Sequence, residues 1–248
     1  VKTSGKESLT TALELFYEGE RVNVMMGDLG SLPNFGPEDL SEEDFDLLQT
    51  SDYACVLNWA STRRYGTELA SSVFSFVKEK GRGKTYYDTG DPSPSKKEIP
   101  KLVKNVLLKG IVDIFSVNEN EAVWYASQLS EGTYSLRKGL KRGELARECA
   151  RILARNLSAR IDLHTTTFTG SFSRKGEVIV PAFKVPVLRA TGAGDAWNAG
   201  NIFGDALGLT DACRLTLANA VAAYYISSPA GRHPTFPQLT EFCSKHRL

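Results

Sequence analysis

The sequence predicts an α/β fold in which a largely parallel β-sheet has helices on both faces, with a small β-hairpin in front of it. Three observations support this fold class. Short apolar segments typical of strands alternate with longer segments whose apolar residues recur at helical spacing. The connections are short, which favours right-handed strand–helix–strand units. The chain has 248 residues, 42% hydrophobic and 24% charged, which is enough to bury one sizeable core.

The first predicted element is a β-hairpin at about residues 9–30. Residues 11–16 and 21–26 alternate apolar and polar side chains on either side of a turn at residues 17–20. This alternation is typical of two antiparallel strands with one solvated face. The hairpin is either a small separate sheet or an edge hairpin of the main sheet, and the pattern alone favours neither.

The strand–helix alternation begins after a loop at residues 27–36. A first helix is predicted to start at Pro37, with acidic residues in its first turn, where the helix dipole favours negative charge. The segments expected to be strands are residues 53–57, 85–88, 112–117, 160–164, 177–180 and 182–188. The later helices are expected at residues 67–80, 102–108, 143–156 and 210–227, and in segments that follow Asn118, Gly194 and Thr235.

The turn at residues 190–195 combines two glycines and an aspartate between a strand-like segment and a helix that runs to about residue 207. Gly192 and Gly194 let a ligand approach the backbone, and the helix N-terminus adds free N–H groups and a positive dipole end, which suits phosphate. Asp195 would repel phosphate unless it has another task, such as accepting a proton from an attacking hydroxyl. Spacing alone leaves a plain turn with a capping aspartate as the alternative.

The sequence Thr-Gly-Ala-Gly-Asp at residues 191–195, followed by Ala-Gly at residues 199–200, resembles the C-terminal signature of the PfkB (ribokinase-like) carbohydrate kinases. The resemblance implies a ribokinase-like fold with the hairpin as a lid over the substrate. It also implies that Asp195 is the catalytic base. The anion hole for the transferred phosphoryl group is then expected from the backbone of Gly192, Ala193 and Gly194.

Asn118 and Glu121 follow a predicted strand and resemble the Asn-x-x-Glu motif of the same family, which implies that they position Mg²⁺ and phosphate. Amide and carboxylate oxygens are suitable neighbours for this hard cation. The alternative is a capping box, with Asn118 at the N-cap and Glu121 three residues later. The resemblance further implies an ATP site that includes Thr165, Gly170, Thr191, Asn219 and Gly231.

The chain departs from the family pattern at three places. Thr167 replaces a usual glycine in the Thr-x-Gly-x-x-Gly loop expected to run from Thr165 to Gly170. Arg189 and Ala190 replace an Asp-Thr pair. The reversed charge argues against a requirement for a monovalent cation, and Arg189 either contacts a phosphate or is simply exposed. No N-terminal sugar-binding signature precedes the hairpin, so residues 1–248 are expected to be one kinase domain lacking its N-terminal part, as a piece of a longer protein or a reduced member.

The function implied by the resemblance is ATP- and Mg²⁺-dependent phosphoryl transfer to a hydroxyl of a sugar or related small molecule, with a nucleoside as the alternative acceptor. A second hypothesis is a non-catalytic protein that binds nucleotides or sugars, which the departures favour and Asp195 opposes. A Rossmann oxidoreductase is disfavoured because the glycine turn comes late and no acidic ribose partner follows it about 20 residues on.

Charge and composition limit the classes of binding partner and metal site that can be expected. The net charge of +1 gives no reason to expect nucleic acid, and no apolar run approaches the length that crosses a membrane, so a cytoplasmic protein is expected. The four cysteines and three histidines are scattered, without the spacing of a zinc or redox site. A lid hairpin of the family type implies a homodimer in which the two hairpins meet.

Overall fold

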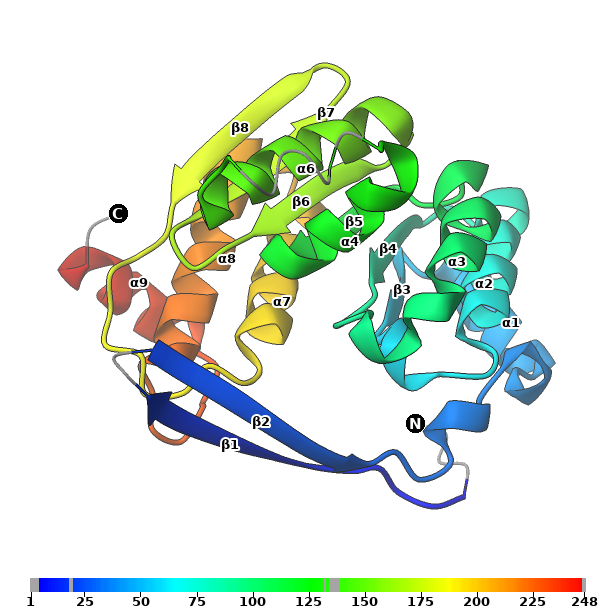
Figure 1. Ribbon diagram of the computed structural model, residues 1–248, viewed down its shortest axis with the longest axis horizontal. Helices are drawn as coiled ribbons and strands as arrows, with labels where there is room; N and C mark the ends of the chain where they lie inside the picture. The colour runs from blue at the N-terminus through cyan, green and yellow to red at the C-terminus, as the bar shows by residue number, and fades with distance from the viewer. Residues whose placement is uncertain (1–4, 18–19, 132, 134–138, 247–248) are drawn as a thin grey trace. The chain divides into compact units, whose positions relative to one another are not determined.

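The computed structural model describes residues 5–17, 20–131, 133 and 139–246. They form a six-stranded sheet of order β3-β4-β5-β6-β7-β8 and a separate two-stranded sheet of β1 and β2 (Figure 1). The large sheet contains β3 (Tyr53–Leu57), β4 (Lys84–Asp88), β5 (Ile114–Asn118), β6 (Arg160–His164), β7 (Phe168–Ser173) and β8 (Gly176–Pro181). Because β4 pairs in parallel with both β3 and β5, the α/β fold class with a largely parallel sheet is confirmed.

Helices separate the first four strands of this sheet, one helix precedes it and three follow it. The α-helices are α1 (Glu42–Thr50), α2 (Gly66–Lys80), α3 (Ile99–Asn105), α4 (Glu119–Leu129), α6 (Arg142–Asn156), α7 (Ala193–Ala206), α8 (Asp211–Ile226) and α9 (Phe236–Lys245). In the described ranges, no helix combines the length and apolar character needed to cross a membrane. The chain divides into two compact units, and each is described by itself.

The first unit consists mainly of Leu29–Leu163, with Phe172–Glu177. Its core is a series of aromatic contacts that joins α2, β4, β5 and α4. The ring centroids are 5.3 Å apart for Phe74 and Tyr87, 5.9 Å for Tyr87 and Phe115, and 5.2 Å for Phe115 and Tyr125. All four rings are fully buried. This packing fixes the start of α4 at the carboxyl end of β5, where polar side chains of an open parallel sheet collect.

The second unit consists of Leu9–Asp28, His164–Ser171 and Val178–Leu248. Its core forms where Trp197 of α7 and Leu215 and Ala218 of α8 pack against Val180 of β8. The two helices approach closely because Gly200 has no side chain, since a Cβ there would lie 2.8 Å from the Cα of Ala218. This close packing holds the N-terminus of α7, and the turn before it, in place.

The hairpin consists of β1 (Leu9–Tyr17) and β2 (Glu20–Asp28), and it is a sheet of its own rather than an edge of the large sheet. The predicted turn residues 18 and 19 lie outside the described residues. Leu13 lies opposite Val24, so odd-numbered residues of β1 share a face with even-numbered residues of β2. That face carries exposed apolar side chains beside Thr11 and Asp28, and we call it the outer hairpin face. Its members, each with 40% to 68% of its surface exposed, are Leu9, Leu13, Leu15, Val24 and Met26.

Three predicted elements differ from the structure. The described segment 182–188 is not a strand, since Pro186 has no N–H to donate and Leu188 N donates to Ile226 O at 2.8 Å instead. Residues 102–108 were predicted as one helix, but α3 ends at Asn105 and a 3₁₀ turn follows. Pro37 starts only a 3₁₀ turn, and α1 begins at Glu42 because Asp44 accepts hydrogen bonds from Ser41 N at 2.8 Å and Ser41 Oγ at 2.9 Å.

Candidate active site

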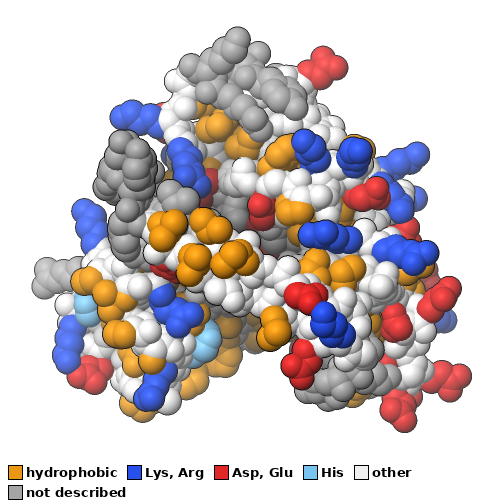
Figure 2. Space-filling view, turned by 60° about the horizontal axis from the view of Figure 1, so that its bottom comes forward, with side chains coloured by type: hydrophobic (Ala, Val, Ile, Leu, Met, Phe, Trp, Pro, Cys, Tyr) orange, Lys and Arg blue, Asp and Glu red, His pale blue; other side chains and the backbone are white. Residues whose placement is uncertain are grey.

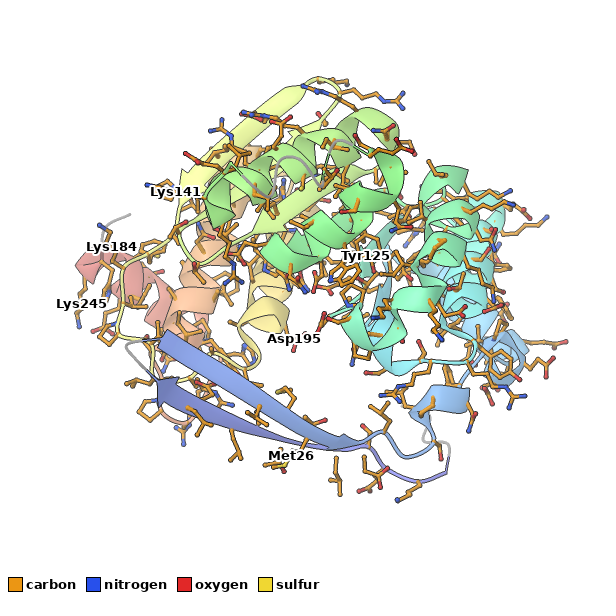
Figure 3. All side chains as sticks on the ribbon, viewed as in Figure 1. Met26, Tyr125, Lys141, Lys184, Asp195 and Lys245 are labelled. Atoms are coloured by element: carbon orange, nitrogen blue, oxygen red, sulfur yellow. The ribbon has the colours of Figure 1, made fainter. Side chains whose placement is uncertain are left out.

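The turn at residues 190–194 leads into α7, and we call it the glycine turn. Gly192 lies at the N-cap with φ of 88°, a left-handed conformation that favours glycine. Being a glycine, the N-cap residue has no side chain to bond the free N–H groups of this helix end. Asp195 lies in the first turn of α7 (Figure 3), and its side chain is exposed. The turn therefore presents a helix N-terminus and a solvent-accessible carboxylate side by side.

The backbone N–H groups of the glycine turn are not all equivalent. Ala193 N donates to Ala190 O at 3.1 Å, which closes the turn onto itself. Gly194 N follows without a side-chain cap, and a Cβ on Gly194 would lie 3.5 Å from Cε1 of His164. The imidazole of His164 in turn packs on the Trp197 ring, with centroids 5.0 Å apart. Of the three expected anion-hole amides, Ala193 N already has a backbone partner.

Glu14 of the hairpin holds the glycine turn from one side. Its Oε1 accepts hydrogen bonds from Ala190 N at 2.6 Å, Thr191 N at 2.9 Å and Thr191 Oγ1 at 3.2 Å. Three donors on one carboxylate oxygen fix two successive residues of the turn. The sequence does not single out Glu14, because a glutamate on an alternating strand is typical of a solvated face.

Tyr225 of α8 holds the glycine turn from another side. Its hydroxyl donates to Thr191 O at 3.0 Å. The same hydroxyl would lie 2.4 Å from a Cβ at position 192, so only glycine fits there. Thr191, expected in the nucleotide site, thus has its N–H, hydroxyl and carbonyl engaged within the chain.

Asn219, another expected nucleotide neighbour, is buried with both ends of its amide engaged. Its Oδ1 accepts from Trp197 Nε1 at 3.0 Å, and its Nδ2 donates to Pro181 O at 2.9 Å. These bonds join α8 to α7 and to the end of β8. Asn219 therefore shapes this part of the second unit through its own internal contacts.

Thr165 and Gly170 do not lie on one loop, contrary to expectation. Thr165 Oγ1 donates to Phe168 O at 2.7 Å and accepts from Phe168 N at 3.0 Å, which closes a tight turn over residues 165–168. Strand β7 starts at Phe168, so Gly170 is buried inside a strand. Gly231, the last expected nucleotide residue, lies in the loop after α8 with φ of 57°.

In the first unit, Asn118 and Glu121 form a complete capping box at the start of α4. Asn118 Oδ1 accepts from Asn120 N at 2.9 Å and Glu121 N at 3.0 Å. Glu121 Oε2 accepts from Asn118 N at 2.9 Å, and Oε1 accepts from Asn118 Nδ2 at 2.6 Å. The structure therefore contains the capping box that was the alternative interpretation of this motif. The same hydrogen bonds fix the carboxylate oxygens of Glu121, which a cation site at this edge of the sheet would need.

Glu121 lies in an acidic environment that its capping role does not explain. The carboxyl is buried, and its pKa is raised well above the usual value, first by burial and then by the nearby carboxylates of Asp88, Asp91 and Glu119. Asp88 ends β4, and Asp91 accepts from Asn120 Nδ2 at 3.2 Å. Asp88 is the last residue of β4 and Asp91 follows three positions later, so the signal available from sequence was their place at the carboxyl end of a predicted strand.

This environment predicts a pH dependence of stability. Because folding raises the pKa of Glu121, the native state holds the proton more tightly than the unfolded chain, and the free energy of unfolding falls as pH rises from the ordinary carboxyl range through the raised pKa. We expect Asp88→Asn, which removes one of the carboxylates that raise this pKa, to flatten that fall. Urea unfolding at a series of pH values, without added divalent cation, measures both curves. The exposed control Asp52→Asn leaves the curve unchanged, and an identical slope for Asp88→Asn and the wild type contradicts the assignment.

The donor set at the start of α4 fits Mg²⁺ bound together with a nucleotide. Within the described ranges, no three His, Cys, Asp or Glu side chains converge closely enough to hold a metal ion by themselves. Mg²⁺ usually takes one or two protein carboxylates and completes its coordination with water and substrate phosphates. The carboxylates near Glu121 match that chemistry, because positive charge among them would offset their mutual repulsion.

Comparison with solved structures gives the same fold. Adenosine kinase from Sinorhizobium meliloti matches with a TM-score of 0.71 at 20% identity, covering 95% of this chain and 65% of that chain. A protein described as a ribokinase II from E. coli, in complex with ATP and Mg²⁺, matches with a TM-score of 0.69 at 14% identity, covering 95% and 71%. Ribokinase from Cryptococcus neoformans var. grubii serotype A in complex with ADP has a TM-score of 0.69 at 15% identity, covering 94% and 71%.

No protein-family model matches the sequence, and no curated protein matches it either. At identities of 14% to 20%, the structural likeness establishes the fold. The predicted ribokinase-like fold, with its separate two-stranded sheet, is therefore confirmed. The chain spans 65% of the length of the adenosine kinase it resembles.

Proposed function

We propose that this protein is a phosphotransferase that moves the γ-phosphoryl group of ATP to a hydroxyl of a sugar or a nucleoside. The observation that carries the proposal is the N-terminus of α7, where a left-handed glycine opens the helix without a side-chain cap and Asp195 is exposed one turn away. Phosphoryl transfer needs an anion site next to a proton acceptor, and this helix end offers both. The likeness to an adenosine kinase and to ribokinases supports both acceptor classes.

In this proposal Asp195 accepts the proton of the attacking hydroxyl. The N–H groups of Gly192 and Gly194 stabilise the charge on the transferred group, and that of Ala193 joins them when it leaves Ala190 O. Glu14 and Tyr225 keep the turn in position between turnovers. Because these two side chains already hold the turn, little of the binding energy would be needed to position it.

Mg²⁺ bound with the nucleotide supplies charge neutralisation on the phosphates. Asn118 and Glu121 are the proposed residues on the protein side, with Asp88 and Asp91 nearby. Thr165, Gly170, Thr191 and Gly231 are proposed as neighbours of the nucleotide. Thr191 would act there by shaping the turn, since its N–H, hydroxyl and carbonyl are engaged within the chain. Asn219 is proposed to shape the wall of the base pocket, since its own amide already bonds Trp197 and Pro181.

A panel of sugars and nucleosides, each incubated with ATP and Mg²⁺, tests the proposal. We expect transfer to one acceptor class, detected as the phosphorylated product by mass spectrometry. The second candidate function, nucleotide binding without catalysis, predicts binding of ATP with no product from any acceptor. The exposed Asp195 argues against it, because a carboxylate beside a bound phosphate weakens binding unless it takes part in the reaction.

We also propose that two copies of the protein pair through the outer hairpin face. Two-stranded sheets are marginal in water by themselves, and an exposed apolar face of this kind is typical of an interaction surface. Figure 2, which brings the hairpin side of Figure 1 forward, shows hydrophobic side chains gathered there, and Met26 is labelled in Figure 3. The occupant we expect is the same face of a second copy, because apolar faces of equal chemistry suit a two-fold contact.

Leu13→Lys combined with Val24→Lys tests this pairing. The two residues lie opposite each other, so the double change places two charges in the middle of the face. Sedimentation velocity is expected to show a dimer for the wild type and a monomer for the variant. Leu47→Lys, at an exposed leucine of α1, is the control and stays dimeric. A monomeric wild type at working concentration overturns the pairing.

A further inference from the structure

Arg189 directly precedes the glycine turn. Its guanidinium lies between the Tyr225 ring and Gly231, and we call this space the Arg189 slot. The guanidinium packs on the ring of Tyr225, with 5.2 Å between Cζ and the ring centroid. On Gly231, a Cβ would lie 2.2 Å from Nη1 of Arg189, so the glycine leaves the room that the guanidinium fills. The imidazole of His233 also stacks on the Tyr225 ring, with the two ring centroids 5.0 Å apart. Neither of the two expectations for Arg189, simple exposure or a phosphate contact, foresaw this packing.

The Arg189 slot lies at the C-terminal end of α8, where the helix dipole is negative. Ile226 O, in the last turn of α8, accepts from Leu188 N at 2.8 Å and from Arg189 N at 3.2 Å. In the part of the chain that the structure describes, no carboxylate pairs with Arg189, and its Nε is buried without a hydrogen-bond partner. The positive charge is therefore offset by the helix end and by the face of the aromatic ring, not by an ion pair.

The ring that carries Arg189 also fixes the glycine turn. Tyr225 donates its hydroxyl to Thr191 O, and that hydroxyl lies in the space next to Gly192. A movement of Tyr225 therefore moves the residues that precede the first amides of α7. Arg189 is thus linked to the glycine turn twice, through the chain itself and through Tyr225.

We propose that Arg189 is an internal cation that braces Tyr225 and the glycine turn, so that the protein needs no small cation from solution at this place. Arg189 is a positioning residue, since it acts on the turn and not on the substrate. The expected changes in kcat rest on the proposed function. The effect of Arg189 on the melting temperature can be measured without any catalytic activity.

Arg189→Ala and Arg189→Lys test the proposal, with Arg232→Ala as the matched control. Arg232 follows Gly231 in the same loop and has an exposed side chain, so its removal changes the net charge equally. We expect kcat of Arg189→Ala to fall about 10- to 100-fold with little change in the KM of the acceptor, as for a misplaced turn. Arg189→Lys keeps the charge without the planar stack and is expected to lie between Arg189→Ala and the wild type.

Chemical rescue separates a cation role from simple packing. Guanidinium, methylguanidinium or K⁺ at non-denaturing millimolar concentrations is expected to raise both kcat and the melting temperature of Arg189→Ala above those in choline at equal ionic strength. The wild type and Arg232→Ala are expected to show the same kcat and melting temperature in K⁺ and in choline.

Three results overturn the proposal: a wild type that needs K⁺, a folded Arg189→Ala with wild-type kcat, or an impaired Arg189→Ala that no cation restores in either kcat or melting temperature. A wild type that phosphorylates no acceptor overturns the proposed function instead. In that case the melting temperatures of the same variants still decide whether Arg189 replaces a cation.

Discussion

Asp195→Asn is expected to lower kcat by about 10²- to 10⁴-fold, the range that general base catalysis contributes. The change keeps the size and the hydrogen-bonding shape of the side chain but removes its ability to take a proton at neutral pH. Asp195 is exposed in the first turn of α7, so its replacement costs no buried contact of the core. Product formation is measured with the acceptor that the wild type uses, and ADP binding is measured by calorimetry.

The control for this change is Asp205→Asn, near the other end of α7, which removes an equal charge from the same helix. It is expected to keep wild-type kcat. The affinity of Asp195→Asn for ADP is expected to stay equal or to rise, since a negative charge near the phosphates is lost. An Asp195→Asn enzyme with kcat within about tenfold of the wild type contradicts the base assignment.

The α7 turn could be predicted from sequence because its determinants are local. Gly192, Gly194 and Asp195 lie within four consecutive positions at the start of a helix, and the conformation of such a turn depends mainly on those residues. The structure confirms a helix after this turn, but α7 already starts at Ala193, and Gly192 at its N-cap has the left-handed conformation. The alternation of parallel strands and helices was predictable for the same reason, because apolar periodicity is read within each segment.

The residues that hold the turn were not predictable in this way. Glu14 meets Thr191 across 177 positions of sequence, and nothing local to a hairpin strand indicates such a contact. Arg189 and Tyr225 are likewise 36 positions apart, and their stacking depends on where α8 ends. Long-range contacts of this kind follow from packing, which a single sequence does not reveal.

Asn118 and Glu121 show a different limit of sequence reasoning. Capping and cation positioning require the same residue types at the same spacing, so the pattern could not separate them. The structure shows the capping bonds directly, while the case for a cation rests on the buried carboxyl and its acidic neighbours. The two roles are compatible, because the capping hydrogen bonds hold the Glu121 carboxylate in one position, where it could also face a cation.

Gly192→Ala is expected to reduce the free energy of unfolding by about 2–4 kcal/mol, from the left-handed backbone and from overpacking. The new Cβ would lie 2.4 Å from the hydroxyl and 3.0 Å from Cζ of Tyr225, so either the ring or the turn has to move. Because that movement displaces the first amides of α7, we also expect kcat to fall by at least about 10²-fold. Urea unfolding and steady-state kinetics on the same preparations measure the two effects.

Two further variants show whether the clash with Tyr225 is the cause. In Gly192→Ala/Tyr225→Phe the hydroxyl is gone, so the double variant is expected to be less destabilised than the sum of the two single changes by about 1 kcal/mol or more. Gly194→Ala is the matched glycine, because its Cβ would lie 3.5 Å from His164 Cε1 and its φ is not left-handed. Alanine suits a helical position better than glycine, so Gly194→Ala is expected to leave stability equal or higher while the methyl group beside the anion site lowers kcat. If the destabilisation of the double variant equals the sum of the two single changes, the clash with Tyr225 is not the cause of the Gly192→Ala effect. Equal destabilisation by Gly192→Ala and Gly194→Ala leads to the same conclusion.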